Sequence, residues 1–233
     1  MNRVKIYRLS LLLSLLIILT YTFVKLPSAT IKEVLTLLKE HLVMVGISMS
    51  FATIIGVTTG ILLSRSIFKK YSNIAMYIVG LGQTIPSLAV LALTMSLLGI
   101  GLKPAIFALT IYTVLPIARN TLSGLSSVSS ELVDAARGLG IPPLKILREI
   151  EIPNALSVII AGIRTALIIN IGTAALGSLV GAGGLGEQIF TGITFLDPWI
   201  MLSGALPTAI LALLGDYTLR WIENVSISEG LKN

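Results

Sequence analysis

The segment ELVDAARGLGIPPLKILREIEIP, residues Glu131 to Pro153, is the longest part of this chain that cannot enter a lipid bilayer. It carries acidic and basic side chains throughout, at Glu131, Asp134, Arg137, Lys145, Arg148, Glu149 and Glu151. Each such group costs roughly 2.5 to 3.5 kcal/mol at the centre of a membrane helix, so the segment must lie in water. Apolar residues at helical spacing between Leu132 and Leu139 predict a short amphipathic helix. Gly138 and Gly140 then loosen the backbone, and Pro142 favours the start of a second short helix.

The composition outside this segment is that of an integral membrane protein. Of the 233 residues, 55% are hydrophobic and 12% are charged, whereas soluble domains average about 25% charged residues. The absence of cysteine excludes disulfides and thiolate chemistry, and the single His41 excludes a metal site built from histidines. The net charge of +6 is not arranged as a basic stripe with interleaved aromatics, so nucleic acid is not expected as a partner.

The apolar runs predict an all-α integral membrane protein with six transmembrane helices. They cover residues 9–24, 41–63, 73–98, 104–122, 155–180 and 199–221. Residues 25–40 separate apolar from charged positions, which predicts a short helix on the outer surface. The run at 9–24 could also be a signal peptide, but its 16 residues exceed the usual 7 to 15, which favours a membrane span.

Basic residues orient these spans. Twelve of the 17 Lys and Arg residues fall in the two termini, in the predicted loop after 63, in the last turns of the spans 104–122 and 199–221, and in the Glu131 segment, and four fall on the other side. The positive-inside rule therefore places both termini and the Glu131 segment in the cytoplasm of a multi-pass protein of the cell membrane, inner or plasma.

The Glu131 segment also resembles the EAA loop of ABC importer permeases. The matching positions are Asp134, Ala135, Ala136, Gly140, Ile150, Ile152 and Pro153. Asp134 stands where the family has Glu, and Ile152 where it has Leu, so charge and bulk are kept. In that family the loop is a coupling helix that docks in a groove of a cytoplasmic ATPase. The resemblance implies ATPase-coupling roles for Glu131, Asp134, Ala135, Ala136, Gly140, Ile150 and Pro153.

Four further stretches are similar to permeases for osmoprotectants such as glycine betaine, carnitine, choline and proline betaine. They are QTIPSLAVLAL (83–93), LPIARNT (115–121), AGIRTA (161–166) and GAGGLG (181–186). Permeases for D-methionine and for phosphonates share similar glycine-rich and alanine-rich signatures, so they remain an alternative. The resemblance implies a type I ABC importer permease fold, alternating access, a homodimer or a heterodimer with a paralogue in the membrane lipid, and an extracellular or periplasmic substrate-binding protein.

Several residues are candidates for the translocation pathway or its gate. They are Gln83, Pro86, Arg164, Asn170, Gly181, Gly183, Gly184 and Gly186. The four glycines formally match GxGxxG, but that motif binds dinucleotides between a strand and a helix, and here it follows an apolar helix. No GxxxxGK[ST] motif occurs in the sequence, so ATP is expected on a partner subunit and no cofactor on this chain. The glycines could form part of an outer gate or a plain turn.

Two ionisable side chains lie deep in predicted spans, Arg164 and Asp216. Helix geometry places them within roughly 6 Å in depth, which predicts an intramembrane ion pair. The alternative is that Arg164 lines the pathway and meets a substrate carboxylate. Outside the membrane, Glu187 and Asp197 could contact a receptor or could be solvated loop charges.

The predicted organisation has three parts: residues 1–40 with the first span and the outer helix, a permease core at 41–222, and a cytoplasmic tail at 223–233. Two other protein classes are weighed against the permease. A secondary transporter or channel needs no cytoplasmic docking element, and the Glu131 segment argues against it. A membrane enzyme needs clustered nucleophiles, acids or metal ligands, and the sequence suggests none, so a non-catalytic subunit is expected.

Overall fold

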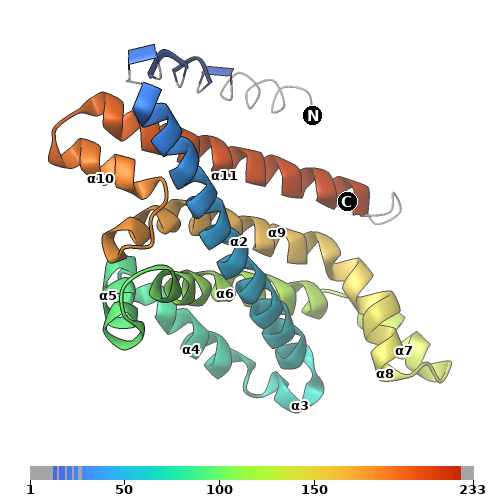
Figure 1. Cartoon of the computed structure of the whole chain (residues 1–233). Coiled ribbons are helices and arrows are strands. Elements are labelled where there is room, and N and C mark those ends of the chain that lie inside the picture. The colour runs from blue at the N-terminus through green and yellow to red at the C-terminus, as the bar shows by residue number, and fades with distance from the viewer. Residues whose placement is uncertain (1–12, 15, 19, 23, 26–27, 227–233) are drawn as a thin grey trace.

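The computed structural model describes residues 13–226 except 15, 19, 23, 26 and 27, and these residues fold as helices connected by short turns, without a strand (Figure 1). In chain order the elements are α2 (Ser28–Ser64), α3 (Ser66–Lys69), α4 (Ser72–Thr84), α5 (Ser87–Leu98), α6 (Leu102–Ser126), α7 (Ser130–Gly138), α8 (Pro143–Ile146), the π-helical η1 (Leu147–Glu151), α9 (Ile152–Ala174), the 3-10 helix η2 (Ala175–Val180), α10 (Gly186–Thr194) and α11 (Pro198–Ser226). The all-α fold predicted from the apolar runs is confirmed.

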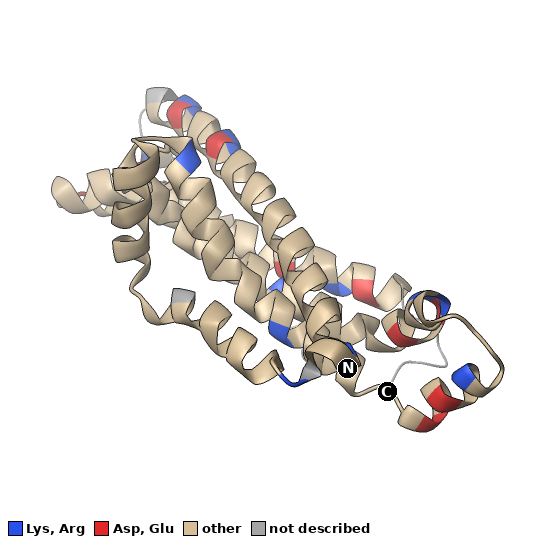
Figure 2. Cartoon of the chain, turned by 90° about the horizontal axis from the view of Figure 1, so that it is seen from below, with Lys and Arg blue, Asp and Glu red and all other residues tan. Residues whose placement is uncertain are grey.

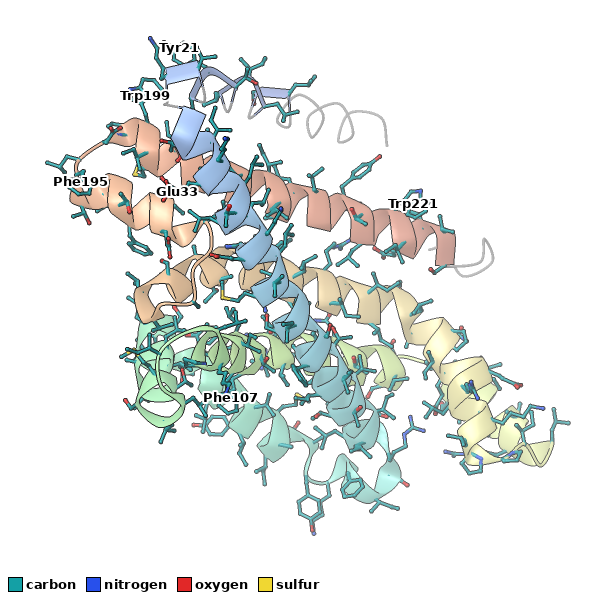
Figure 3. The ribbon with its side chains drawn as sticks, viewed as in Figure 1. Tyr21, Glu33, Phe107, Phe195, Trp199 and Trp221 are labelled. Carbon is teal, nitrogen blue, oxygen red and sulfur yellow. The ribbon has the colours of Figure 1, made fainter. Side chains whose placement is uncertain are left out.

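Four of the described helices are long and apolar enough to cross a membrane: 30–64, 102–126, 143–180 and 198–226. The span predicted over residues 73–98 is instead two shorter apolar helices, α4 and α5. The span predicted at 9–24 lies largely outside the described residues. Trp199 and Trp221 lie near opposite ends of α11 (Figure 3), as expected of side chains at the two membrane interfaces.

The prediction of a separate outer helix at residues 25–40 is wrong. Helix α2 runs without interruption from Ser28 to Ser64, so the residues between 28 and 40 are the first turns of a 37-residue helix. The sequence has no proline after Pro27 and no glycine before Gly46 in this region, so nothing breaks the helix where its polarity changes. The boundary expected at residue 40 therefore falls inside one element.

The core of the molecule is formed where α2 crosses α6 and α9 (Figure 1). Gly56 and Gly60 face α6 so closely that a Cβ atom at Gly60 would lie 2.5 Å from Thr121 Cβ and 2.8 Å from the Ala118 carbonyl oxygen. Small residues four positions apart permit this close approach of membrane helices.

The break between α4 and α5 follows from Pro86. Ile85 is held in extended conformation (ψ 132°), as the residue before a proline usually is, and its carbonyl accepts a hydrogen bond from the Tyr112 hydroxyl. The Tyr112 carbonyl would ordinarily bond the N–H of residue 116, which is a proline. Gln83 Nε2 donates to that carbonyl instead, at 2.7 Å. The side chains of Gln83 and Tyr112 thus satisfy backbone groups at the two proline sites of neighbouring helices.

The region expected to be an outer loop, residues 181–198, also differs from the prediction. It contains α10, whose Gly186, Gln188 and Gly192 are buried against neighbouring helices. A Cβ at Gly192 would collide with the backbone of Met201, so α10 and α11 form a tightly packed helical hairpin. Gly186 and Gly192 permit this close helix packing, whereas Gly181, Gly183 and Gly184 form the turn that precedes α10.

The glycine contacts yield a matched pair of substitutions. We expect Gly60→Ala to destabilise the folded chain by about 1–3 kcal/mol, because the new methyl group has no space beside α6. Gly46 lies on the same helix, and a methyl group at this position would meet nothing within 4 Å, so Gly46→Ala should be neutral or stabilise by up to about 1 kcal/mol. Thermal unfolding of the purified chain in detergent measures both, and equal midpoints for the two variants would contradict the packing argument.

Candidate functional site

The candidate site is the coupling segment, defined as residues 131–153. Helices α7 and α8 project from one end of the molecule and carry a concentration of acidic and basic residues (Figure 2). The segment has the predicted form of a helix, a glycine break and a second helix. It differs from the prediction at its end, where the second helix continues through η1 into α9 without interruption.

Helix α7 begins at a side-chain cap. The Ser129 hydroxyl accepts a hydrogen bond from the Leu132 N–H at 3.3 Å and donates to the Glu131 carboxylate. The hydrogen bond from the Ser129 hydroxyl, with one from the backbone N–H of Glu131, holds the pKa of the Glu131 carboxyl below its ordinary value. Glu131 therefore stays ionised in the first turn, where a negative charge interacts favourably with the helix dipole.

Gly140 ends α7 in a Schellman motif. Its φ is +75°, the Gly140 N–H bonds the Arg137 carbonyl at 2.9 Å, and the Ile141 N–H bonds the Ala136 carbonyl at 3.2 Å. This pattern requires a left-handed residue at position 140, where glycine has no Cβ penalty. The turn that separates α7 from α8 thus depends on the backbone freedom of Gly140.

The second half of the segment is joined to the membrane helix by continuous helical backbone. Residues from Ile146 to Ile152 keep right-handed helical backbone angles, and the Ile152 N–H reaches back five residues to the Leu147 carbonyl. Pro153 has no N–H to donate to the Glu149 carbonyl, four residues earlier, and Glu149 lies in this π-helical turn. Ile146 is buried, and Leu147 packs on Leu125 and Ile159.

Apolar side chains remain uncovered on the same segment. Leu132, Leu139 and Leu144 are 44%, 80% and 73% exposed, whereas Ala136 is buried within the chain. The segment also carries two exposed ion pairs within its own helices, Arg137–Asp134 at 3.1 Å and Lys145–Glu149 at 3.9 Å. An exposed apolar surface framed by charges on a water-facing segment is a typical docking surface for another protein.

Asn170 lies inside the helix bundle. It is fully buried; its Oδ1 accepts from Ser48 Oγ at 3.0 Å, and its Nδ2 lies 3.4 Å from Thr113 Oγ1. These hydrogen bonds join α2, α6 and α9. The Asn170 amide therefore holds three helices together, and its assignment to the pathway stays a prediction.

The glycine turn at residues 181–186 packs against the outer part of α2. Gly181, Gly183 and Gly184 have φ of +74°, +75° and +88°, and the Gly184 N–H donates to Glu40 Oε2 at 3.1 Å. A Cβ at Gly183 would collide with the Glu40 carboxylate, and one at Gly186 with the Ala175 carbonyl. The glycines are thus required both by the backbone angles and by close packing.

Two outer acids have distinct surroundings. Asp197 Oδ1 accepts hydrogen bonds from the N–H groups of Trp199 (2.8 Å) and Ile200 (3.2 Å), so it caps the first turn of α11. Partial burial, together with the charges of Glu40 and Glu33, raises the pKa of the Glu187 carboxyl above its ordinary value. Figure 3 shows Glu33 on the part of α2 beside α10. The sequence alone did not predict this acidic group on α2 and α10.

Arg164 lies beside Asp216, with Nε 3.4 Å from Oδ1, as expected of an ion pair between α9 and α11. A second acid, Glu223, accepts from Arg164 Nη1 at 3.0 Å, and Arg220 Nη2 lies 3.7 Å from the other Asp216 oxygen. The Arg164 side chain is 20% exposed and is engaged by both acids. This arrangement favours a structural role over contact with a substrate carboxylate.

Sequence reasoning missed Glu223, Tyr112 and the ion pair between Arg65 and Glu151. Arg65 Nη2 lies 2.6 Å from Glu151 Oε2 and joins the end of α2 to the coupling segment. The positive-inside rule assigns both residues to the cytoplasmic side. Their opposite charges on one side of the membrane could have suggested an ion pair, but the sequence does not show which basic and acidic residues meet.

A family model described as "Binding-protein-dependent transport system inner membrane component" matches residues 52–224. An osmoprotectant import permease protein, OsmY of Salmonella typhimurium, is 47% identical over 189 residues, which cover 81% of this chain and 80% of that protein. The choline transport system permease protein OpuBB of Bacillus subtilis is 41% identical, covering 83% and 88%. An inward-facing structure of the MetNI methionine ABC transporter superposes with a TM-score of 0.77 at 26% identity, covering 87% and 100%.

Glu187 provides a test of the electrostatics outside the membrane. Because its pKa is raised in the folded chain, ionisation opposes folding; the penalty is complete above the folded pKa and absent below the ordinary value of about 4.3. We expect Glu187→Gln to raise the thermal midpoint near pH 7 and to have no effect near pH 4. A midpoint difference that grows as the pH falls would refute this interpretation.

The two acids on Arg164 predict non-additive substitutions. Asp216→Asn or Glu223→Gln alone should be tolerated, because the guanidinium keeps one carboxylate. The double variant leaves Arg164 without an acid, and its loss of stability should exceed the sum of the single losses by about 0.5–3 kcal/mol. Unfolding midpoints of the four proteins in detergent measure the difference, and strictly additive losses would show that the acids do not share Arg164.

Proposed function

The chain belongs to the family of binding-protein-dependent transport system inner membrane components, and on this premise we propose that it is the permease subunit of an ATP-driven importer of osmoprotectants. The substrates proposed are small zwitterionic or cationic solutes such as glycine betaine, carnitine, choline or proline betaine. The transport functions of relatives 40–47% identical to this chain support that choice.

The observation that carries the proposal is the geometry of the coupling segment. It presents exposed Leu132, Leu139 and Leu144 on a turn fixed by Gly140, and it is continuous with the 143–180 membrane helix. An element of this form can receive a partner's movement and pass it into the membrane, because the backbone stays helical from α8 through η1 into α9. Glu131, Asp134, Ala135, Ala136, Ile150 and Pro153 belong to this docking element.

The partner at this surface is a cytoplasmic ATPase subunit, since the sequence has no P-loop of its own. Two copies of this chain, or one copy with a paralogue, enclose the pathway, and a separate binding protein delivers substrate from outside. This arrangement requires both termini and the coupling segment to lie in the cytoplasm, in agreement with the distribution of Lys and Arg.

Substrate selectivity is assigned to the binding protein. Recognition of a quaternary ammonium normally uses several aromatic faces, and this chain has two Trp, six Tyr and six Phe, of which Tyr21, Tyr71, Tyr77, Tyr217, Phe51, Phe107, Phe195 and Trp221 are strongly exposed. The glycine turn at Gly181, Gly183, Gly184 and Gly186 is proposed as part of the outer gate. Gln83 and Pro86 are proposed to border the pathway through the break between α4 and α5.

A second candidate substrate is methionine, because the MetNI methionine transporter shares the fold at 26% identity. The higher identity of the osmoprotectant permeases favours the first candidate. Uptake of labelled glycine betaine and of labelled methionine by the same vesicles separates the two.

The proposal predicts the effect of a substitution at the end of α7. We expect Gly140→Asp to abolish ATP-dependent uptake of labelled glycine betaine in vesicles that contain this chain, its ATPase and its binding protein. The aspartate strains the left-handed turn and adds a charge to the docking surface. Gly140→Asn tolerates the backbone angles without the charge and should retain part of the uptake. Uptake that continues without ATP would remove the importer proposal in favour of a secondary transporter.

A further inference from the structure

The ion pair between Arg65 and Glu151 stands apart from the other ion pairs of the coupling segment. Its atoms are 2.6 Å apart, and the Glu151 side chain is 10% exposed, whereas the side chains of the pairs Arg137–Asp134 and Lys145–Glu149 are all more than half exposed. Those two pairs lie within the segment, at i,i+3 and i,i+4. The Arg65–Glu151 pair instead joins the segment to the end of α2.

Arg65 is itself held in place at the point where α2 ends. Its Nε and Nη2 atoms donate to Ser64 Oγ at 3.1 and 2.8 Å, and the Ser64 hydroxyl donates to the Ile61 carbonyl at 2.7 Å. Gly60, one turn before, is in close contact with α6. The guanidinium is therefore fixed relative to the α2–α6 pair.

Glu151 lies at the weakest point of the helix that leads from the coupling segment into the membrane. It is the last residue of η1, a π-helical turn between α8 and α9. Such turns interrupt the regular hydrogen-bond pattern of an α-helix and often occur at functional sites. A movement of α7 and α8 could bend the helix at this turn, and α9 would then not move with them.

We propose that Arg65 and Glu151 are positioning residues of the coupling step: their ion pair clamps the π-helical turn to the end of α2. Movement imposed on the coupling segment then reaches α2 and α6 together with α9. This inference rests on the proposed function, because it assumes that an ATPase moves the segment. A purely structural pair would matter for folding and would leave the coupling of ATP hydrolysis to transport unchanged.

The test uses the complete complex in vesicles, with labelled glycine betaine as the probe and with uptake and ATP hydrolysis measured together. A variant with one partner removed leaves a buried charge unpaired and can fail to fold. The decisive variant is therefore the double change Arg65→Gln and Glu151→Gln, which leaves no unpaired charge. We expect it to assemble and hydrolyse ATP while uptake per ATP falls at least about fivefold, the lower end of typical couplings between sites.

Two further proteins complete the design. The charge exchange Arg65→Glu with Glu151→Arg restores the attraction and should recover at least half of the uptake per ATP. Lys70→Gln removes a charge five residues from Arg65 in the sequence and should leave that ratio unchanged. A double-neutral variant that transports as efficiently as the unmodified complex would overturn the clamp. If the unmodified complex takes up glycine betaine without ATP, the proposed function itself fails.

Discussion

Hydrocarbon offers no hydrogen bonds to a peptide group, and the interior of this chain is organised by that constraint. Pro116 leaves the Tyr112 carbonyl without its helical N–H, and Gln83 supplies a donor. Tyr112 in turn donates to the Ile85 carbonyl at the break before Pro86. These two side chains thus satisfy backbone groups that prolines have disturbed. The irregular backbone between α4 and α5 is possible in a membrane because Tyr112 of α6 provides a donor to it.

The same constraint limits how far the sequence alone could predict the fold. Charge and helical periodicity predicted the coupling segment and its glycine break, because those features depend on residues close together in the chain. The continuity of α2 through residue 40 was missed, since a change from amphipathic to apolar composition suggested a boundary where no helix-breaking residue exists. The glycines after residue 180 suggested one loop, but glycine serves equally for a turn with positive φ and for close helix packing. Gly181, Gly183 and Gly184 form the turn, and Gly186 and Gly192 allow α10 to pack closely.

Polar contacts between distant segments were the hardest features to predict. The predicted depth in the membrane is enough to suggest that Arg164 pairs with Asp216. Glu223 was assigned to the cytoplasmic tail, yet its carboxylate lies 3.0 Å from Arg164 Nη1. Asn170 was assigned to a pathway because a polar group in a membrane helix suggests function. The structure uses it to join three helices. Sequence periodicity indicates which side of a helix is polar, but it does not identify the neighbouring helix that covers that side.

The polar contacts of α2 have a consequence for how such a molecule can move. Arg65 pairs with Glu151 at the C-terminal end of α2, Ser48 binds Asn170 midway, and Glu40 binds the Gly184 N–H beyond the C-terminal end of α9. His41 Nε2 also lies 3.1 Å from the Ile171 carbonyl. Contacts distributed along the whole length of two helices oppose both sliding and separation, so α2 and α9 should move as one body. Relative movement is then left to the elements joined by interrupted backbone, namely the broken α4–α5 pair. An importer built in this way would open by displacement of this pair around a rigid α2–α6–α9 centre, to which the coupling segment is directly attached.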